Sequence, residues 1–150
     1  MQHDTTIDYR QHPEAYFIGR GETGVLRVEP YKSELLPHWR FKTPAVAQVS
    51  ADTLMNCFEA YKAAGDFVGM DMTRKFIQMG YTRSRRYANH KGGRKYDPHT
   101  GDVKPRDQED PEKAASARIF AQALARIKSN ADYLSMKKNH QALYRRHHQG

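Results

Sequence analysis

The chain has 150 residues, of which 38% are hydrophobic and 11% aromatic, and its formal net charge is +8. This length fits one domain over residues 1–150, and the supply of aromatic residues argues against a disordered chain. No apolar run approaches the ~20 residues of a membrane helix, and the first residues lack the features of a secretory signal. The single cysteine, Cys57, has no partner for an internal disulfide. We therefore expect a cytoplasmic protein with no membrane partner.

The first 42 residues carry turn and strand signals. Three glycines within residues 19–24 predict a turn, and strand-like residues 16–18 and 25–29 on either side of it predict a small β-hairpin. Residues 38–42 alternate as a strand does, with their two aromatic side chains on one side. Residues 19–24 also match G-x-G-x-x-G, but a strand-like segment follows where a dinucleotide-binding loop needs a helix. A hairpin turn is the better interpretation.

From residue 44 onward the apolar spacing becomes helical, and we predict helices over residues 44–64, 66–89 and 110–140. The first ends at Gly65, and the third begins at Asp110, which can cap a helix. The predicted core stripe of the third helix is Phe120, Leu124, Ile127, Ala131 and Leu134. The expected fold class is mainly α with a small β element (α+β). It would be a single compact domain of about three helices plus an N-terminal β-hairpin.

The excess positive charge is concentrated in one segment. Eight basic residues and no acidic residue lie between residues 74 and 96, and the other 17 Lys and Arg are matched by 17 Asp and Glu. A core-facing stripe is predicted along the first half of the second helix: Val68, Met72, Phe76 and Met79. Arg83 and Arg86 continue that stripe. Because buried arginines are rare without a partner, we expect both to be exposed on a helix end that is basic all round.

An exposed basic segment of this kind predicts an anionic partner. Arginine matches phosphate oxygens, interleaved tyrosines suit base stacking, and the glycines at 92 and 93 would let the backbone approach a phosphate. The leading hypothesis is therefore nucleic-acid binding, to DNA or RNA, without a cofactor or a metal. The candidate contact residues are Arg74, Lys75, Arg83, Arg85, Arg86, Tyr87, His90, Lys91, Arg94, Lys95 and Tyr96.

Three other interpretations of the basic segment stay open. It could hold the nucleic-acid or phosphorylated substrate of an enzyme, with His38, Asp71 or His90 in acid–base chemistry. It could dock on an acidic protein partner. It could also be a solvated helix face whose charges pair with distant acids such as Glu109 or Asp110.

Two further groups have a structural interpretation that we prefer. Asp71 stands three and four residues before Arg74 and Lys75, the usual spacing of a helix ion pair. Trp39 and Phe41 suit a core, although the basic residues beside them would also suit a stacking platform. The eight histidines show no metal-ligand spacing.

Long stretches of the chain resemble a known family. These are residues 19–30 (GRGETGVLRVEP), 31–44 (YKSELLPHWRFKTP), 67–97 (FVGMDMTRKFIQMGYTRSRRYANHKGGRKYD) and 106–114 (RDQEDPEKA) with the helix after them. They are similar to an uncharacterised family of short bacterial and bacteriophage proteins, catalogued as a domain of unknown function. The resemblance covers most of the chain and implies no activity, cofactor or catalytic residue. The functional hypothesis therefore rests on the residues themselves.

Overall fold

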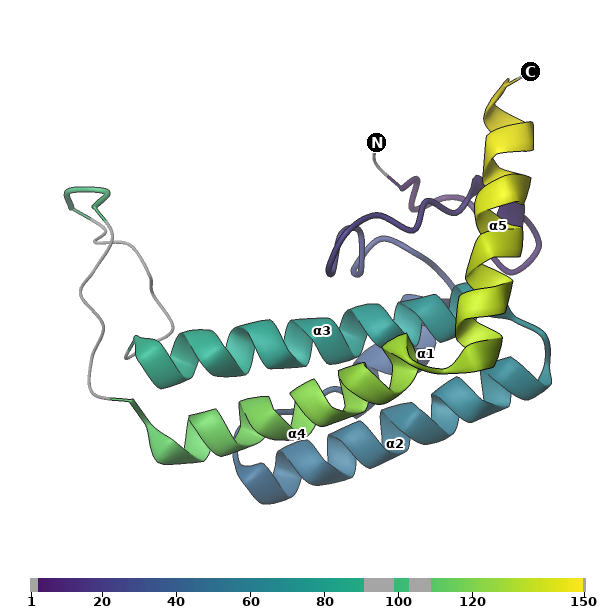
Figure 1. The fold of residues 1–150 in the computed structure, drawn as a ribbon. Helices are drawn as coiled ribbons and strands as arrows, with labels where there is room; N and C mark the ends of the chain where they lie inside the picture. Colours follow the sequence, from purple (N-terminus) through teal and green to yellow (C-terminus); the bar gives the residue numbers. More distant parts are fainter. Residues whose placement is uncertain (1–2, 91–98, 103–108, 150) are drawn as a thin grey trace.

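The computed structural model describes residues 3–90, 99–102 and 109–149, and their regular structure is helical throughout. The elements are η1 (Pro13–Ala15), α1 (Tyr31–Leu35), η2 (Leu36–His38), α2 (Pro44–Ala63), α3 (Phe67–Asn89), α4 (Pro111–Lys128) and α5 (Ala131–Gln149). Figure 1 shows α2, α3 and α4 side by side, while α5 turns steeply away from α4. The most extensive contacts of α3 are with α4, and both helices pack on α2. No helix in the described part of the chain has the length and apolar character needed to cross a membrane.

The N-terminal segment, residues 3–30, contains no strand, so the predicted α+β fold with a β-hairpin is wrong. Its three glycines between residues 19 and 24 have positive φ, as a hairpin turn would also require. Here, however, backbone N–H groups across residues 20–27 donate repeatedly to carbonyls three residues earlier, which makes successive turns. Val25 and Val28 are both buried, a spacing that turns produce and an alternating strand does not.

Residues 38–42 are likewise no strand, although the predicted alternation of their side chains is confirmed. Trp39 and Phe41 pack together against the core, with ring centroids 5.0 Å apart. The side chain of Ser50 in α2 takes the place of a neighbouring strand. Its hydroxyl accepts the backbone N–H of Arg40 at 3.0 Å and donates to a carbonyl of the same segment at 2.7 Å. The segment is therefore fixed against a helix.

The helices predicted at 44–64 and 66–89 are confirmed as α2 and α3. Local signals explain the agreement, because both helices begin at a capping side chain. Thr43 accepts the N–H of Val46, and Asp66 accepts the N–H of Gly69.

The third predicted helix, 110–140, is two helices that meet at a corner. Ser129 ends α4, and the side chain of Asn130 accepts the backbone N–H of Tyr133 to begin α5. The predicted stripe is correct as far as Ile127, but Leu134 is 45% exposed. The corner changes which face of the helix meets the core, and Tyr133 is buried instead.

The first half of α3 is buried on all sides. The predicted core stripe is confirmed, since each of these residues is at most 1% exposed: Val68, Met72, Phe76 and Met79. The opposite side is buried as well, because the N-terminal segment and α5 cover it. The first half of α3 therefore has no solvent-exposed face, although only one buried stripe was predicted from the sequence.

Candidate functional site

Three charged side chains on that covered side of α3 form a buried charge cluster: Asp71, Arg74 and Lys75. Asp71 is 0% exposed and accepts hydrogen bonds from Arg74 Nε at 2.6 Å, from the Tyr16 hydroxyl at 2.5 Å and from the Tyr133 hydroxyl at 2.6 Å. Burial raises the pKa of Asp71, but Arg74 above all, together with Lys75 and Tyr133, outweighs that effect and holds the pKa below its usual value. One carboxylate thus joins α3, the N-terminal segment and α5.

The cost of burying the Lys75 charge is offset by fewer favourable contacts than the cost of burying the Asp71 charge. Its ammonium group donates to the carbonyl oxygen of Phe17 at 3.3 Å and lies 4.6 Å from the ring centroid of Tyr16. Burial lowers the pKa of Lys75 to about 8, even though Asp71 acts in the opposite direction. The same Phe17 carbonyl lies 2.8 Å from His3 Nε2, and burial lowers the pKa of His3 to about 4.

The buried charge cluster is closed to a substrate. Both oxygens of Asp71 are engaged, and neither Asp71 nor Lys75 has exposed surface. His90 cannot assist Asp71, because 19 residues of one helix separate them by about 28 Å. His38 is exposed. Among the described residues, no group of three or more His, Cys, Asp or Glu side chains is placed to hold a metal.

The predicted nucleic-acid contacts divide into buried and exposed residues. Arg74 and Lys75 belong to the buried charge cluster, and His90 is buried at the end of α3. Arg86 is exposed, whereas Arg83 is half-buried, so the expectation of exposure holds fully only for Arg86. Four candidates lie outside the described residues: Lys91, Arg94, Lys95 and Tyr96.

Arg85 has an acidic partner. Its Nη2 lies 3.4 Å from Glu109 Oε2, and it also donates to Asn89 at 3.1 Å. The sequence suggested Glu109 as one of several distant acids that could pair with the basic segment, and among the three arginines on the helix end it pairs with this one alone. Arg83 and Arg86 form no ion pair within the part of the chain that the structure describes.

Tyr87 is the candidate that the structure brings together with other suitable side chains. Its ring centroid lies 5.9 Å from that of Phe41 and 5.9 Å from Lys113 Nζ. Lys113 also donates to the carbonyl of Lys42. A cavity of about 510 Å³ lies here, and we call it the aromatic–basic pocket. Among the described residues, three aromatic side chains, three cations and one leucine line it, and no carboxylate does: Leu36, Trp39, Arg40, Phe41, Lys42, Tyr87 and Lys113.

Sequence reasoning found part of this pocket. The alternation of aromatic and basic residues between 39 and 42 was visible, and Tyr87 was a candidate because arginines precede it. Lys113 was missed, since it is one of several charged residues in the first turn of α4 and nothing nearby marks it. Only the packing of α4 beside α3 brings it to Tyr87.

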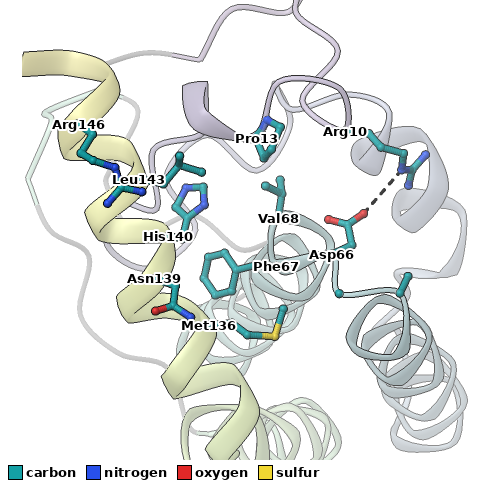
Figure 2. A pocket seen from close by; sticks show the side chains of 12 residues that line it. Arg10, Pro13, Asp66, Phe67, Val68, Met136, Asn139, His140, Leu143 and Arg146 are labelled. Carbon is teal, nitrogen blue, oxygen red and sulfur yellow. Dashed lines mark ion pairs between the residues drawn. The ribbon is translucent and has the colours of Figure 1, made fainter. Parts of the chain in front are cut away.

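A larger cavity, of about 640 Å³, lies between α5, the start of α3 and the N-terminal segment (Figure 2). Phe67, Val68 and Leu143 form apolar walls. The cation at one end, Arg10, is already neutralised, because it pairs with Asp66 at 3.6 Å, as drawn in Figure 2, and with Glu34 at 2.7 Å. Arg10 therefore contributes little positive charge for binding an anion at that end of the cavity.

Comparison with known proteins gives a family and no activity. Neither the curated proteins nor the solved structures contain a match. A family model described as a domain of unknown function, DUF4385, matches residues 1–143. The match includes the buried charge cluster, the aromatic–basic pocket and the part of α5 up to residue 143. The chain therefore belongs to the DUF4385 family.

Proposed function

We propose that the protein binds nucleic acid through the aromatic–basic pocket and the exposed end of α3. The observation that carries the proposal is the composition of this pocket, where the described residues bring three aromatic rings and three cations together and contribute no carboxylate. Cations of this kind bind phosphate oxygens, and aromatic faces stack on bases. The two kinds of group stand close enough here to contact one nucleotide.

The surroundings of the pocket extend the basic surface. Tyr87 is 39% exposed, so its ring is accessible. Arg83 lies one helical turn before Tyr87 and shares its face, and Arg86 is exposed beside it. These residues would hold the phosphates that flank a stacked base, whereas Arg85 contributes less because Glu109 already neutralises it.

The geometry favours a single strand over a duplex. The rings of Trp39 and Phe41 are partly buried, and a base has to leave its pair and its neighbours in a stack to reach them in a cavity of about 510 Å³. Contacts from cations and ring faces position a strand without reading its sequence, so we propose little sequence preference. The proposal also includes a cytoplasmic location, together with the bacterial or bacteriophage source that the resemblance implies.

The test is fluorescence anisotropy with labelled dT12, rU12 and a 12-base-pair duplex across a series of salt concentrations. We expect Tyr87→Ala to weaken binding of both single strands about tenfold, because base stacking contributes roughly 1–3 kcal/mol. Lys113→Ala should weaken binding and lower the slope of log K against log salt by about 0.7 for one lost phosphate contact.

Arg126→Ala is the matched control, because Arg126 is exposed on α4 and does not line the pocket. Because this substitution removes only one distant charge, it should weaken nucleic-acid binding by no more than about twofold. The proposal fails if the parent protein binds none of the three probes at low salt. It also fails if Tyr87→Ala binds as tightly as Arg126→Ala while both retain the parent's circular dichroism spectrum.

A further inference from the structure

Another cavity lies against α5, and we call it the α5 pocket; no acidic side chain among the described residues lines it. It has a volume of about 670 Å³ and separates one face of α5 from residues 16–23 of the N-terminal segment. Lys137, Gln141 and Arg145 recur at every turn of the helix, so a single face of α5 supplies them. Arg20 comes from the opposite wall. We infer that the α5 pocket binds a small phosphorylated ligand that carries an aromatic ring, as a mononucleotide does.

The positively charged lining of the α5 pocket favours an anionic ligand. Arg20, Lys137 and Arg145 line it together, and none of them forms an ion pair within the described part of the chain. In the neighbouring cavity of Figure 2, by contrast, one of the two arginines that line it, Arg10, is already held by two carboxylates. A phosphate that enters the α5 pocket would bring the counter-charge that the described residues do not supply.

The floor of the pocket is fixed in place before a ligand arrives. Residues 16–18 line this part of the pocket, and the carbonyl groups of Tyr16 and Phe17 are held from the protein side. His140 Nε2 lies 2.8 Å from the Tyr16 carbonyl oxygen, and Lys75 donates to the Phe17 carbonyl oxygen. A site whose walls are already ordered loses less conformational entropy when a ligand binds.

The apolar part of the lining suits a ring. Phe17 and Tyr144 both line the pocket, with their ring centroids 5.8 Å apart. Thr23 and Gln141 add a hydroxyl and an amide, which match the hydroxyl groups of a sugar. Burial lowers the pKa of His140, so at neutral pH the positive charge comes from the two arginines and the lysine.

The α5 pocket is separate from the proposed nucleic-acid site. Tyr16, which lines the pocket, bonds to Asp71 near the start of α3, and Tyr87 lies 16 residues further along the helix, about 24 Å away. Figure 1 shows α5 beside the N-terminal end of α3 and far from the C-terminal end of that helix. A mononucleotide in the α5 pocket would therefore leave the aromatic–basic pocket free.

The first experiment is isothermal titration calorimetry of the full chain with AMP, adenosine and inorganic phosphate. We expect AMP to bind at least tenfold more tightly than either fragment, because only AMP has both a ring and a phosphate. Arg20→Ala combined with Arg145→Ala should weaken AMP binding at least tenfold. Lys138→Ala removes an exposed charge from the next position of α5 without touching the pocket, and its affinity should stay within about twofold of the parent's.

The second experiment uses the unmodified chain and so does not depend on a variant folding. Titration of AMP into 15N-labelled protein should shift the amide signals of Gly19, Thr23 and Gln141 and leave that of Tyr87 in place. The inference is overturned if millimolar AMP gives neither heat nor shifts, or if the double variant binds AMP as Lys138→Ala does. It is also overturned if dT12 displaces AMP and Tyr87→Ala abolishes AMP binding, since AMP would then occupy the nucleic-acid site. Failure of dT12 to bind would sink the proposed function and leave this inference standing.

Discussion

Lys75 is a cation enclosed by the N-terminal segment, and its environment gives stability a particular dependence on pH. The folded pKa of about 8 lies below the ordinary value of 10.5. Between these values the unfolded chain binds more protons than the folded one, so the free energy of unfolding rises as pH rises. Below pH 8 the lysine is charged in both states, and the cost of its burial is fully present.

We therefore expect the free energy of unfolding, measured by urea denaturation, to increase from pH 8 to about pH 10. Lys75→Met should remove most of this increase, because its side chain fills similar space without a charge. At still higher pH stability should fall, since burial raises the pKa values of Tyr16 and Tyr133, and these groups ionise first in the unfolded chain. Cys57, whose pKa is also raised by burial, acts in the same direction as the tyrosines. An identical pH profile in Lys75→Met would contradict this account.

The sequence predicted the partner of Asp71 but not its surroundings. The three-residue spacing to Arg74 indicated an ion pair, which the structure contains at 2.6 Å. Its burial could not be predicted, because the covering hydroxyls belong to Tyr16 and Tyr133, which lie 55 and 62 residues away in the chain. Helical periodicity describes one face of α3 and holds no information about what covers the other.

Among the elements, α3 and α4 approach each other closely at Gly80. A Cβ atom at this position would lie 2.8 Å from ring atoms of Phe120. Alanine ordinarily favours a helix by about 1 kcal/mol over glycine. Gly80→Ala should nevertheless destabilise the protein by about 1–3 kcal/mol, because the ring has to move within a packed core.

Urea denaturation of a double-mutant cycle separates this contact from helix propensity. Phe120→Leu leaves room for the added methyl group, so Gly80→Ala should destabilise the Phe120→Leu variant less than it destabilises the parent. If Gly80→Ala raised the urea midpoint of the parent, the close approach of α3 and α4 at this position would be wrong.

The elements that the sequence predicted well are those with strong local signals. Asp110 and Pro111 mark the start of α4, and a capping residue likewise marks α2 and α3. The corner after Lys128 was missed because neither glycine nor proline interrupts the helical pattern there. The hairpin prediction for residues 16–29 was wrong because their glycines suit one tight turn as well as several. Packing against the covered side of α3 stabilises the several successive turns, and the sequence alone does not reveal that this side of the helix is covered.

In the molecule as a whole, the first half of α3 lies between α2 and α4 on one side and the N-terminal segment and α5 on the other. We expect the amides of residues 70–77 to exchange more slowly than any other segment in hydrogen–deuterium exchange at neutral pH, because opening them requires that both sides separate. Residues 83–89 of the same helix are the internal control and should exchange faster, since they are less completely covered. Equal rates in the two halves would contradict this arrangement.

The candidate sites follow from the same arrangement, and this is why the sequence found them only in part. Tyr87 and Arg86 were predicted because charge and aromatic residues are neighbours in the chain. The α5 pocket was not predicted, because Arg20 and Arg145 stand at opposite ends of the sequence and meet only when the N-terminal segment packs on α5. Contacts of this kind depend on the complete fold.

The corner at Ser129 and Asn130 limits how the length of the chain can vary. One inserted or deleted residue there would rotate everything after it by about 100° about the axis of α5. Tyr133 would turn away from Asp71, and Lys137 and Arg145 would leave the wall of the α5 pocket that lies opposite Arg20. A single insertion would thus disrupt the buried charge cluster and the α5 pocket together. Relatives that keep this carboxylate should therefore keep the connection between α4 and α5 at constant length and place their insertions elsewhere.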